Sequence, residues 1–309
     1  MDLAQLRTLV HVAELGSLSK AAGRLRIAQP ALSRQIRLLE DELGARLFDR
    51  HGRGMVITEA GREALRHAKR VLAETEELRA SVSGPGAELT GHVAVGLPPT
   101  LADMISVPLV AAFSATHPRV RLQLVAAYTG YLLDSLYRGE IDLAVLYDPR
   151  APRSLRIRPL MQEALFLIGP GDAGLTAEEP VPFRALAGQR LLLPSTRHGL
   201  RNMVQHFADE AGIALDIGLE IDSYTALKDL VRQGYGRTIL TRAPMHEDIA
   251  AGRLTAAPLV DPAPIRRLVL SFQPDRPVSR AAEFAGAAIA AIMAEQLSQG
   301  VWVGEMLAG

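Results

Sequence analysis

Several features that define whole classes of protein are missing from this sequence of 309 residues. It has no cysteine, which excludes disulfide bonds, thiolate zinc sites and thiol-based redox sensing. Its 34 basic and 34 acidic residues balance, so composition alone does not indicate a nucleic-acid-binding protein. No run of eighteen apolar residues is free of charge, and the chain opens on a helical period instead of a signal peptide. We therefore expect a soluble, cytoplasmic protein with no membrane partner.

Metal and cofactor signatures are also missing. The chain has eight histidines, and none of them falls at metal-ligand spacing. His198 and His206 lie too far apart to share one helical turn, so structural or surface roles are the simpler interpretation. We expect no metal and no tightly bound cofactor.

The first sixty residues predict a cluster of helices. Leu3, Leu6, Leu9, Val10 and Ala13 recur at helical spacing, and Gly16–Ser17 ends this helix and starts another. The second helix buries small and apolar side chains and exposes two basic ones. Its buried side is Leu18, Ala21, Ala22 and Leu25, and its exposed basic residues are Lys20 and Arg24.

The third helix carries two different faces. Pro30 suits a first helical position, because its fixed φ is helical and its missing N–H would be unpaired there, which puts Gln29 at the N-cap. One face is apolar, with Leu32, Ile36, Leu39 and Leu43 at spacings of four, three and four. The other face is polar, with Pro30, Ser33, Arg34 and Arg37. One packed side and one side rich in donors is what a major-groove recognition helix needs.

Two short strands follow, Arg46–Arg50 and Met55–Thr58, around a turn with a glycine on each side of Arg53. Such a turn would project the guanidinium of Arg53 outward, where it suits phosphate or minor-groove contact. For any one of these charges alone, an ordinary solvated surface is the simpler explanation. The helix and the hairpin together favour DNA binding.

The run from Gly16 to Gly61, GSLSKAAGRLRIAQPALSRQIRLLEDELGARLFDRHGRGMVITEAG, resembles the DNA-binding segment of LysR-type transcriptional regulators. The resemblance implies that Gln29, Pro30, Ser33 and Arg34 approach bases and nearby phosphates. It also implies that the DNA backbone is contacted by Ser17, Lys20, Arg37, Arg50 and Arg53.

A long helix is predicted next, with Thr58 as its cap. Its apolar and small residues alternate at spacings of three and four: Gly61, Ala64, Ala68, Val71, Thr75, Leu78 and Val82. This seam could pack against a partner helix or against its own chain. The resemblance implies a homodimer through helix 58–83, and also a tetramer. It further implies a near-palindromic DNA site and contact with RNA polymerase. Ser83–Gly86 ends the helix as a hinge.

From Gly91 the pattern changes to apolar runs that alternate with helical stretches, which is the βαβ rhythm of α/β lobes. The helices are expected near 100–116, 129–138, 199–211, 223–233 and 279–297. The strands are expected at 92–97, 120–127, 141–147, 164–168, 190–193, 215–221, 237–241 and 268–272.

Four strand-to-helix junctions of this region carry hydroxyls near a helix start. The first junction, Leu97–Thr100, contains Pro99 and Thr100. The second, Tyr128–Gly130, contains Thr129; the third, Pro194–Thr196, contains Ser195; and the fourth, Asp222–Tyr224, contains Ser223. Helix capping accounts for any one hydroxyl by itself. Converging on one cleft at the carboxyl ends of strands, they would form a site for a small, anionic molecule.

This layout resembles the effector domain of LysR-type regulators, which is itself similar to periplasmic binding proteins. The resemblance implies one lobe from 91–161 and 267–294, a second from 162–266 and an effector between them, and it makes Thr100, Thr129, Ser195 and Thr196 ligand-contact positions. Stretches such as VGLPPT and GEIDLAVLYD look most like the nitrogen assimilation control branch. Arg237 departs from the family pattern and is left open between effector contact and solvent. The tail from Gly300 to Leu307, with Trp302, has no counterpart.

The predicted architecture is an α+β multidomain chain: a winged helix-turn-helix over 1–58, a linker helix and hinge over 59–88, and a two-lobed α/β effector-binding domain over 89–309. Two rivals are weaker. Gly169–Gly174 fits G-x-G-x-x-G, but Pro180 and Pro182 prevent a long helix from following, so an enzyme with a dinucleotide site is disfavoured and no catalytic residue is proposed. A free-standing solute-binding protein leaves the first ninety residues unexplained.

Overall fold

The computed structural model describes residues 1–51, 54–82, 89–147, 155–274 and 277–307; the side chains of 50–51, 76–77 and 79–82 are outside the description. The chain divides into two compact units. The first takes in Met1–His92 with the short segments Arg119–Arg121 and Arg138–Glu140, and the second takes in Val93–Pro118, Leu122–Tyr137 and Ile141–Gly309.

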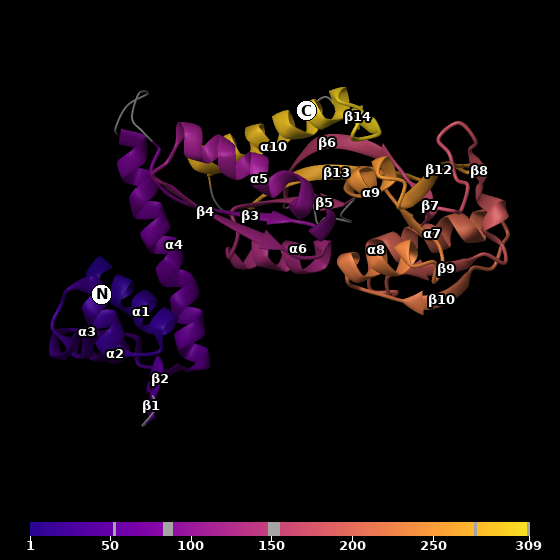
Figure 1. The fold of residues 1–309 in the computed structure, drawn as a ribbon. Helices are drawn as coiled ribbons and strands as arrows, with labels where there is room; N and C mark the ends of the chain where they lie inside the picture. The colour runs from indigo at the N-terminus through magenta and orange to yellow at the C-terminus, as the bar shows by residue number, and fades with distance from the viewer. Residues whose placement is uncertain (52–53, 83–88, 148–154, 275–276, 308–309) are drawn as a thin grey trace. The chain divides into compact units, whose positions relative to one another are not determined.

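The first unit contains three short helices, a hairpin and one long helix, in the predicted order (Figure 1). Leu9, Leu32 and Ile36, each 0% exposed, meet in its core. The hairpin pairs antiparallel with Phe48 opposite Ile57. The bounds are α1 Leu3–Leu15, α2 Leu18–Leu25, α3 Gln29–Leu43, β1 Phe48–His51, β2 Gly54–Ile57 and α4 Glu59–Val82.

The beginning and the end of α3 differ from the prediction. The helix begins at Gln29, so the N-cap is Ala28, whose carbonyl accepts the backbone N–H of Leu32 at 3.2 Å. The placement of Gln29 at the N-cap was therefore wrong by one residue, because Pro30 sits one position further into the first turn. Leu43, predicted to be buried, is 45% exposed, since the helix ends there at Gly44 in the left-handed conformation.

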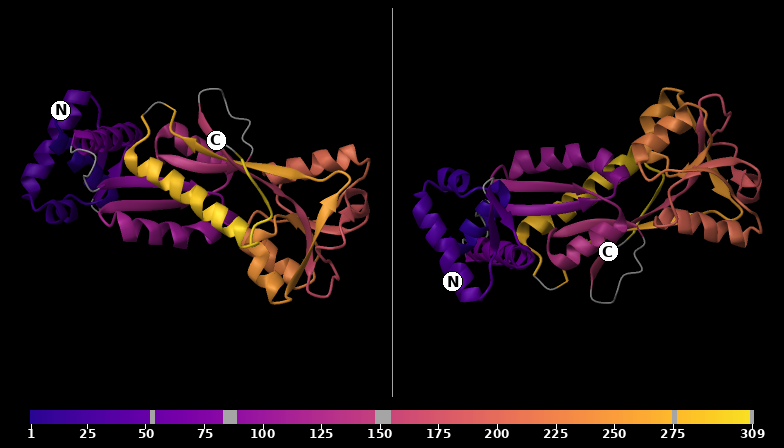
Figure 2. Two further views of the ribbon diagram at one scale, coloured as in Figure 1. Left: turned by 90° about the horizontal axis from the view of Figure 1, so that it is seen from above. Right: turned by 90° about the horizontal axis from the view of Figure 1, so that it is seen from below.

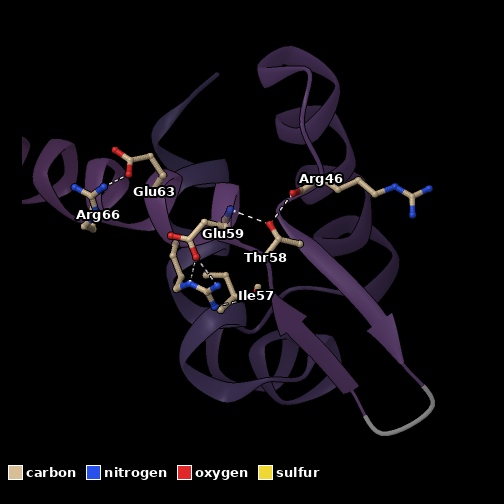
Figure 3. Close-up of polar contacts among 8 residues, drawn as sticks. Arg46, Ile57, Thr58, Glu59, Glu63 and Arg66 are labelled. Carbon is tan, nitrogen blue, oxygen red and sulfur yellow. Dashed lines mark hydrogen bonds and ion pairs between the residues drawn. The ribbon is translucent and has the colours of Figure 1, made fainter.

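The start of α4 is tied to the hairpin (Figure 3). Thr58 caps the helix as predicted: its Oγ1 accepts the backbone N–H of Gly61 at 2.9 Å and donates to the carbonyl of Arg46 at 2.7 Å. Gly61 approaches the chain so closely that a Cβ there would lie 2.1 Å from the carbonyl oxygen of Leu47. Only glycine lets α4 leave the hairpin at this point.

The predicted seam of α4 separates into two parts. Its first part packs on its own chain, because Ala68 is 1% exposed in the core of the first unit and Ala64 and Leu72 pack there too. Val71 and Leu78, seven residues apart, are 42% and 63% exposed. Intrachain packing thus accounts for Ala64 and Ala68, whereas Val71 and Leu78 are exposed.

The second unit has two lobes. The first lobe is a six-stranded sheet in the order β14-β6-β13-β5-β3-β4, with α5 and α10 on one face and α6 on the other (Figures 1 and 2). β3 and β5 run parallel, and β13 runs antiparallel to both of its neighbours. The bounds are β3 Gly91–Leu97, α5 Pro99–Thr116, β4 Val120–Ala126, α6 Thr129–Arg138, β5 Leu143–Tyr147, β6 Arg156–Ala164, β13 Ile265–Phe272, α10 Arg280–Ser298 and β14 Gly304–Met306.

Close packing explains how the helices sit on this sheet. Gly286 of α10 lies against β13, where a Cβ would be 2.7 Å from Leu270 Cδ2. On the other face, Gly96 of β3 leaves room for Leu132 of α6. Helix α5 is apolar enough to pass for a membrane span by composition, but Leu101, Ile105, Leu109 and Phe113 along it are buried in the lobe. That is the pattern of a core helix.

The second lobe contains a four-stranded sheet, β11-β7-β12-β8, and the parallel pair β9 and β10, joined by a bridge from Leu191 to Arg237. Its core includes Phe183, Leu192 and Val204, each 0% exposed. The bounds are β7 Phe166–Pro170, β8 Val181–Pro182, η1 Phe183–Leu186, β9 Arg190–Leu193, α7 Gly199–Glu210, β10 Asp216–Glu220, α8 Tyr224–Arg232, β11 Thr238–Leu240, η2 Ala243–Met245, α9 His246–Ala250 and β12 Leu254–Val260.

The lobes exchange chain at two points, near Leu165 between β6 and β7 and over 261–264 between β12 and β13. Residues 162–164 and 265–266 therefore belong to the six-stranded sheet, whereas the sequence placed them in the other lobe. The G-x-G-x-x-G segment forms the end of β7 and a turn, with a left-handed Gly174.

Candidate functional site

The polar face of α3 is exposed, whereas Leu32, Ile36 and Leu39 on the opposite face are buried. Gln29, Pro30, Arg34 and Arg37 are exposed, and Ser33 is half-buried. The first turn of α3 carries no acidic side chain. The structure therefore brings together the five predicted residues of this helix on one accessible surface.

Two polar residues that the sequence did not single out hold α3 in place. Thr8 Oγ1 of α1 donates to Gln35 Oε1 of α3 at 2.5 Å, and Thr8 is only 1% exposed. At the other end, Glu40 Oε1 accepts the backbone N–H groups of Leu47 and Phe48 at 2.8 and 3.3 Å. These bonds fix the helix to α1 and to the start of the hairpin, which keeps its polar face in one orientation.

Of the residues predicted to contact the DNA backbone, Ser17 and Lys20 lie at the start of α2. Ser17 Oγ accepts the backbone N–H of Lys20 at 3.4 Å, so it caps α2, and Lys20 itself is exposed. Arg50 lies in β1 opposite Met55, but its side chain is outside the described residues, as is the whole of Arg53. The hairpin is joined to the α1–α2 turn by the N–H of Met55, which donates to the carbonyl of Gly16 at 2.9 Å.

A cavity of about 800 Å³ lies between the two lobes of the second unit. Its walls combine aromatic rings with basic groups, and no Asp or Glu belongs to the lining that the described residues form. The aromatic side chains are Tyr128, Tyr147, Phe207 and Tyr224, and the basic or imidazole ones are Arg197, His198, His206 and Arg266.

Three of the predicted effector positions line this cavity: Pro99, Thr100 and Thr129. The hydroxyls of Thr100 and Tyr147 are hydrogen-bonded at 2.8 Å, and Thr129 Oγ1 accepts the backbone N–H of Tyr147 at 3.4 Å. Burial raises the pKa of Tyr147 to about 12, helped by Glu163 and opposed by Arg266 and Thr100. Tyr147 therefore keeps its proton and can act as a donor at neutral pH.

The other four predicted positions are absent from the described lining of this cavity, and three of them, Ser195, Ser223 and Arg237, have a local partner. Ser195 donates through its backbone N–H and Oγ to the carboxylate of Asp222, at 2.8 and 3.0 Å. These bonds, the backbone one first, hold the pKa of Asp222 below its usual range despite some burial. Thr196, next along the chain, is exposed. Arg237 Nη1 donates to Gln189 Oε1 at 2.8 Å.

Ser223 follows the capping explanation, since its Oγ accepts the backbone N–H of Ala226 at 3.3 Å at the start of α8. It also lines a smaller hollow of about 520 Å³, which shares Pro99, Tyr128 and Tyr224 with the main cavity. The hollow therefore adjoins the mouth of the cavity.

His198 lies in the cavity wall as the N-cap of α7. Its Nδ1 accepts the backbone N–H of Leu200 at 3.1 Å, and its ring meets that of Tyr128 edge-on at 4.6 Å. Burial and then the charge of Arg266 lower its pKa to about 4, against a smaller opposite effect of Asp222. The ring is thus neutral, and because Nδ1 is an acceptor its Nε2 carries the proton and is a donor.

Arg266 is the deepest charge of the cavity, at 3% exposure. Its Nε and Nη2 donate to Oε1 of Glu163, at 2.8 and 2.6 Å, and its guanidinium lies 3.5 Å from the ring centre of Tyr147. The sequence did not single out either charge. In the sequence, each is simply a charged residue within an apolar strand. The pattern of a single strand does not tell whether such a charge is buried or exposed.

Both units match known families. Residues 3–62 match the model of the bacterial regulatory helix-turn-helix protein, lysR family, and residues 86–291 match the LysR substrate binding domain. The chain is 31% identical to the HTH-type transcriptional regulator BbuR of Bordetella bronchiseptica, over 98% of this chain and 94% of that protein. It is 34% identical to the nitrogen assimilation regulatory protein nac of Klebsiella aerogenes, over 78% of each chain.

Solved structures of LysR-type regulators share the fold of this chain. A Corynebacterium glutamicum OxyR C206 mutant superposes with a TM-score of 0.68 at 28% identity, over 100% of this chain and 98% of that one. Full-length CbnR in complex with its target DNA has a TM-score of 0.65 at 23% identity, over 96% and 99% of the chains, which shows a shared fold. Since these relatives are of several kinds, the predicted closeness to the nitrogen assimilation branch is not supported.

The neutral state of His198 predicts a pH dependence. The unfolded chain binds a proton at this ring near pH 6.5 and the folded one only near 4, so the folded state loses stability as pH falls through this window, by roughly 2 kcal/mol at pH 5. His198→Asn keeps a cap acceptor for α7 and removes the titration. In thermal unfolding at pH 7 and pH 5, we expect a smaller loss of melting temperature in the variant. An equal loss in both proteins would show that His198 is not buried as a neutral ring.

Proposed function

Because the chain belongs to the LysR family of DNA-binding transcriptional regulators, we propose that α3 recognises bases of a near-palindromic DNA site and that a small anionic effector in the cavity controls this activity. The family is one of regulators, not enzymes, and cytoplasmic localisation accords with it. The observation that carries the DNA assignment is the exposed polar face of α3, backed by the fully buried Leu32, Ile36 and Leu39.

The chemistry of this face fits base recognition. Arg34 is exposed and long enough to bond guanine O6 and N7, and Gln29, at the first turn, can pair with adenine N6 and N7. Ser33, Pro30 and Arg37 complete the surface, and Ser17, Lys20, Arg50 and Arg53 are proposed for the phosphates. Exposed cations next to an uncapped helix start favour polyanions.

We expect Ser33→Ala with Arg34→Ala to abolish protection in a footprint on the DNA upstream of the protein's own gene, because each base contact contributes about 1–3 kcal/mol of discrimination. Arg24→Ala is the matched control: it removes an exposed arginine of α2 that pairs with Glu14 at 3.0 Å. The control should still protect the site. If the double variant protects DNA as well as the wild type does, α3 is not the recognition helix.

We propose that the protein works as a dimer through α4, and as a tetramer of two such dimers. Val71 and Leu78 are one heptad apart on the same side of the helix and are 42% and 63% exposed in the single chain, a spacing and exposure that fit a coiled-coil contact. A two-fold pair of recognition helices would contact two half-sites, which accounts for a near-palindromic site. Contact with RNA polymerase is proposed from family membership alone.

Charging this part of α4 should separate the subunits. We expect Val71→Glu with Leu78→Glu to lower the sedimenting mass by half or more, since four glutamates at the seam of a dimer repel and resist burial. Lys69→Glu, an exposed position two residues from Val71 and on another side of the helix, should leave the mass unchanged. A double variant that sediments like the wild type would place the dimer contact elsewhere.

The effector proposal rests on the charge of the cavity. Its volume of about 800 Å³ suits a small molecule. The buried guanidinium of Arg266, the Nε2–H of His198 and the hydroxyls of Thr100 and Thr129 all favour an anionic group, while four aromatic rings favour an apolar body. Ser195, Thr196, Ser223 and Arg237 would then have structural roles in the lobe around the cavity. A thiol-based signal is excluded, because the chain has no cysteine.

Thermal unfolding with small carboxylates, amino acids and their analogues tests this proposal. We expect at least one carboxylate, benzoate being the simplest aromatic probe, to raise the melting temperature, since a ligand at 100 times its Kd stabilises by about 2.7 kcal/mol. The matched neutral amide, benzamide for benzoate, should not do so. Equal stabilisation by both would remove the anionic requirement. A uniform lack of stabilisation would favour a regulator that needs no effector.

A further inference from the structure

The C-terminal tail, which the sequence could not place, forms the edge of the six-stranded sheet. β14 pairs antiparallel with β6, with Gly304 opposite Glu163 and Met306 opposite Met161. The fit is close, because a Cβ on Gly304 would lie 2.2 Å from the carbonyl oxygen of Gln162. This pairing brings Trp302, just before β14, beneath the buried end of β6.

Trp302 is the only tryptophan of the chain and is 3% exposed. Its indole N–H donates to Oε2 of Glu163 at 2.6 Å, while Oε1 of the same carboxylate accepts Arg266. Glu163 is 1% exposed, so it has a different donor on each oxygen inside the protein. From Arg266 the contacts continue to the ring of Tyr147 and from its hydroxyl to Thr100.

The contact with Trp302 affects how Glu163 holds Arg266 at the cavity. A carboxylate and a guanidinium prefer a bidentate pair with two parallel bonds, which would use both oxygens of Glu163. Here the indole N–H donates to Oε2, and Nε and Nη2 of Arg266 both donate to Oε1, so the ion pair is made through one oxygen where Arg266 lines the cavity. Without the indole N–H, Oε2 would be a buried acceptor with no partner, and the carboxylate would turn toward Arg266.

We propose that the tail is a positioning element of the effector cavity, in which Trp302 sets, through Glu163, the position of Arg266. The proposal rests on the proposed effector function for its biological meaning, but the coupling itself does not require a ligand. Trp302 is a positioning residue and touches no effector. Its N–H carries the role, and its apolar body fills space that phenylalanine could also fill.

The single tryptophan makes the coupling measurable. In the uniformly ¹⁵N-labelled protein its indole N–H gives one cross-peak, whose position depends on its bond to Glu163. We expect Arg266→Lys to move this peak, since Glu163 then has a different partner on its other oxygen. Arg158→Lys is the matched control: the same change on the neighbouring strand β6, at a residue that pairs with Glu283 on the surface. It should leave the peak in place.

Thr100→Val is the second variant, in case Arg266→Lys fails to fold. It removes the hydroxyl bonded to Tyr147 at the far end of the chain of contacts and should also move the indole peak, by less. An indole peak unmoved by whichever of these variants folds overturns the proposal, because the tail would then be a structural strand only.

The functional arm uses benzoate. We expect Trp302→Phe to weaken its binding about tenfold while Arg158→Lys leaves it unchanged, a split that a merely structural tail would not produce. Unchanged affinity in Trp302→Phe would overturn the positioning role. If benzoate fails to bind the wild type, the effector proposal loses its support, whereas the tail proposal is then decided by the indole peak alone.

Discussion

The effector-binding unit depends on one buried ion pair, Arg266 with Glu163. Two charges at 3% and 1% exposure are costly to remove from water, and removing one partner leaves the other uncompensated. The structure satisfies this constraint with bonds from three elements: β13 supplies Arg266, β6 supplies Glu163, and the tail supplies the indole of Trp302. The pair lies where the chain crosses between the lobes. The bonds that join β6, β13 and the tail therefore also place a cation at the cavity.

In the DNA-binding unit, packing and hydrogen bonds hold one helix in a fixed orientation. A helix that recognises bases must keep its polar face free, so the rest of the unit has to hold it from behind. Apolar packing of Leu32, Ile36 and Leu39 does most of this, and the buried bonds of Thr8 and Glu40 fix its orientation. At the start of α4, Gly61 lets the long helix leave the hairpin at close range, which joins the helix-turn-helix directly to the helix that carries the proposed dimer contact.

Local pattern was enough for much of the fold. The stripe of α3, the cap at Thr58 and the strand at 190–193 each follow from periodicity or a single capping residue, and each is present. β6 and β12 were missed because Pro159 and Pro258 interrupt them, and proline argues against a strand unless its neighbours are known. β14 is three residues long and exists only because β6 offers an edge.

The cavity was predictable only in part, because its chemistry depends on contacts distant in sequence. Thr100 and Thr129 follow their strands directly and line it, whereas the hydroxyl of Ser195 is used by Asp222, 27 residues away. Arg266 and Glu163 are 103 residues apart, and nothing in either strand announces the other.

The most direct test is DNA affinity, measured with and without the carboxylate that best stabilises the protein, in wild type and in Arg266→Met with Glu163→Gln. The double variant removes both charges and keeps an acceptor for Trp302. We predict that the ligand changes the DNA dissociation constant or footprint of the wild type, and that the variant binds DNA but no longer responds. An equal ligand response in both proteins would contradict the assignment of Arg266 as the cation that receives the effector.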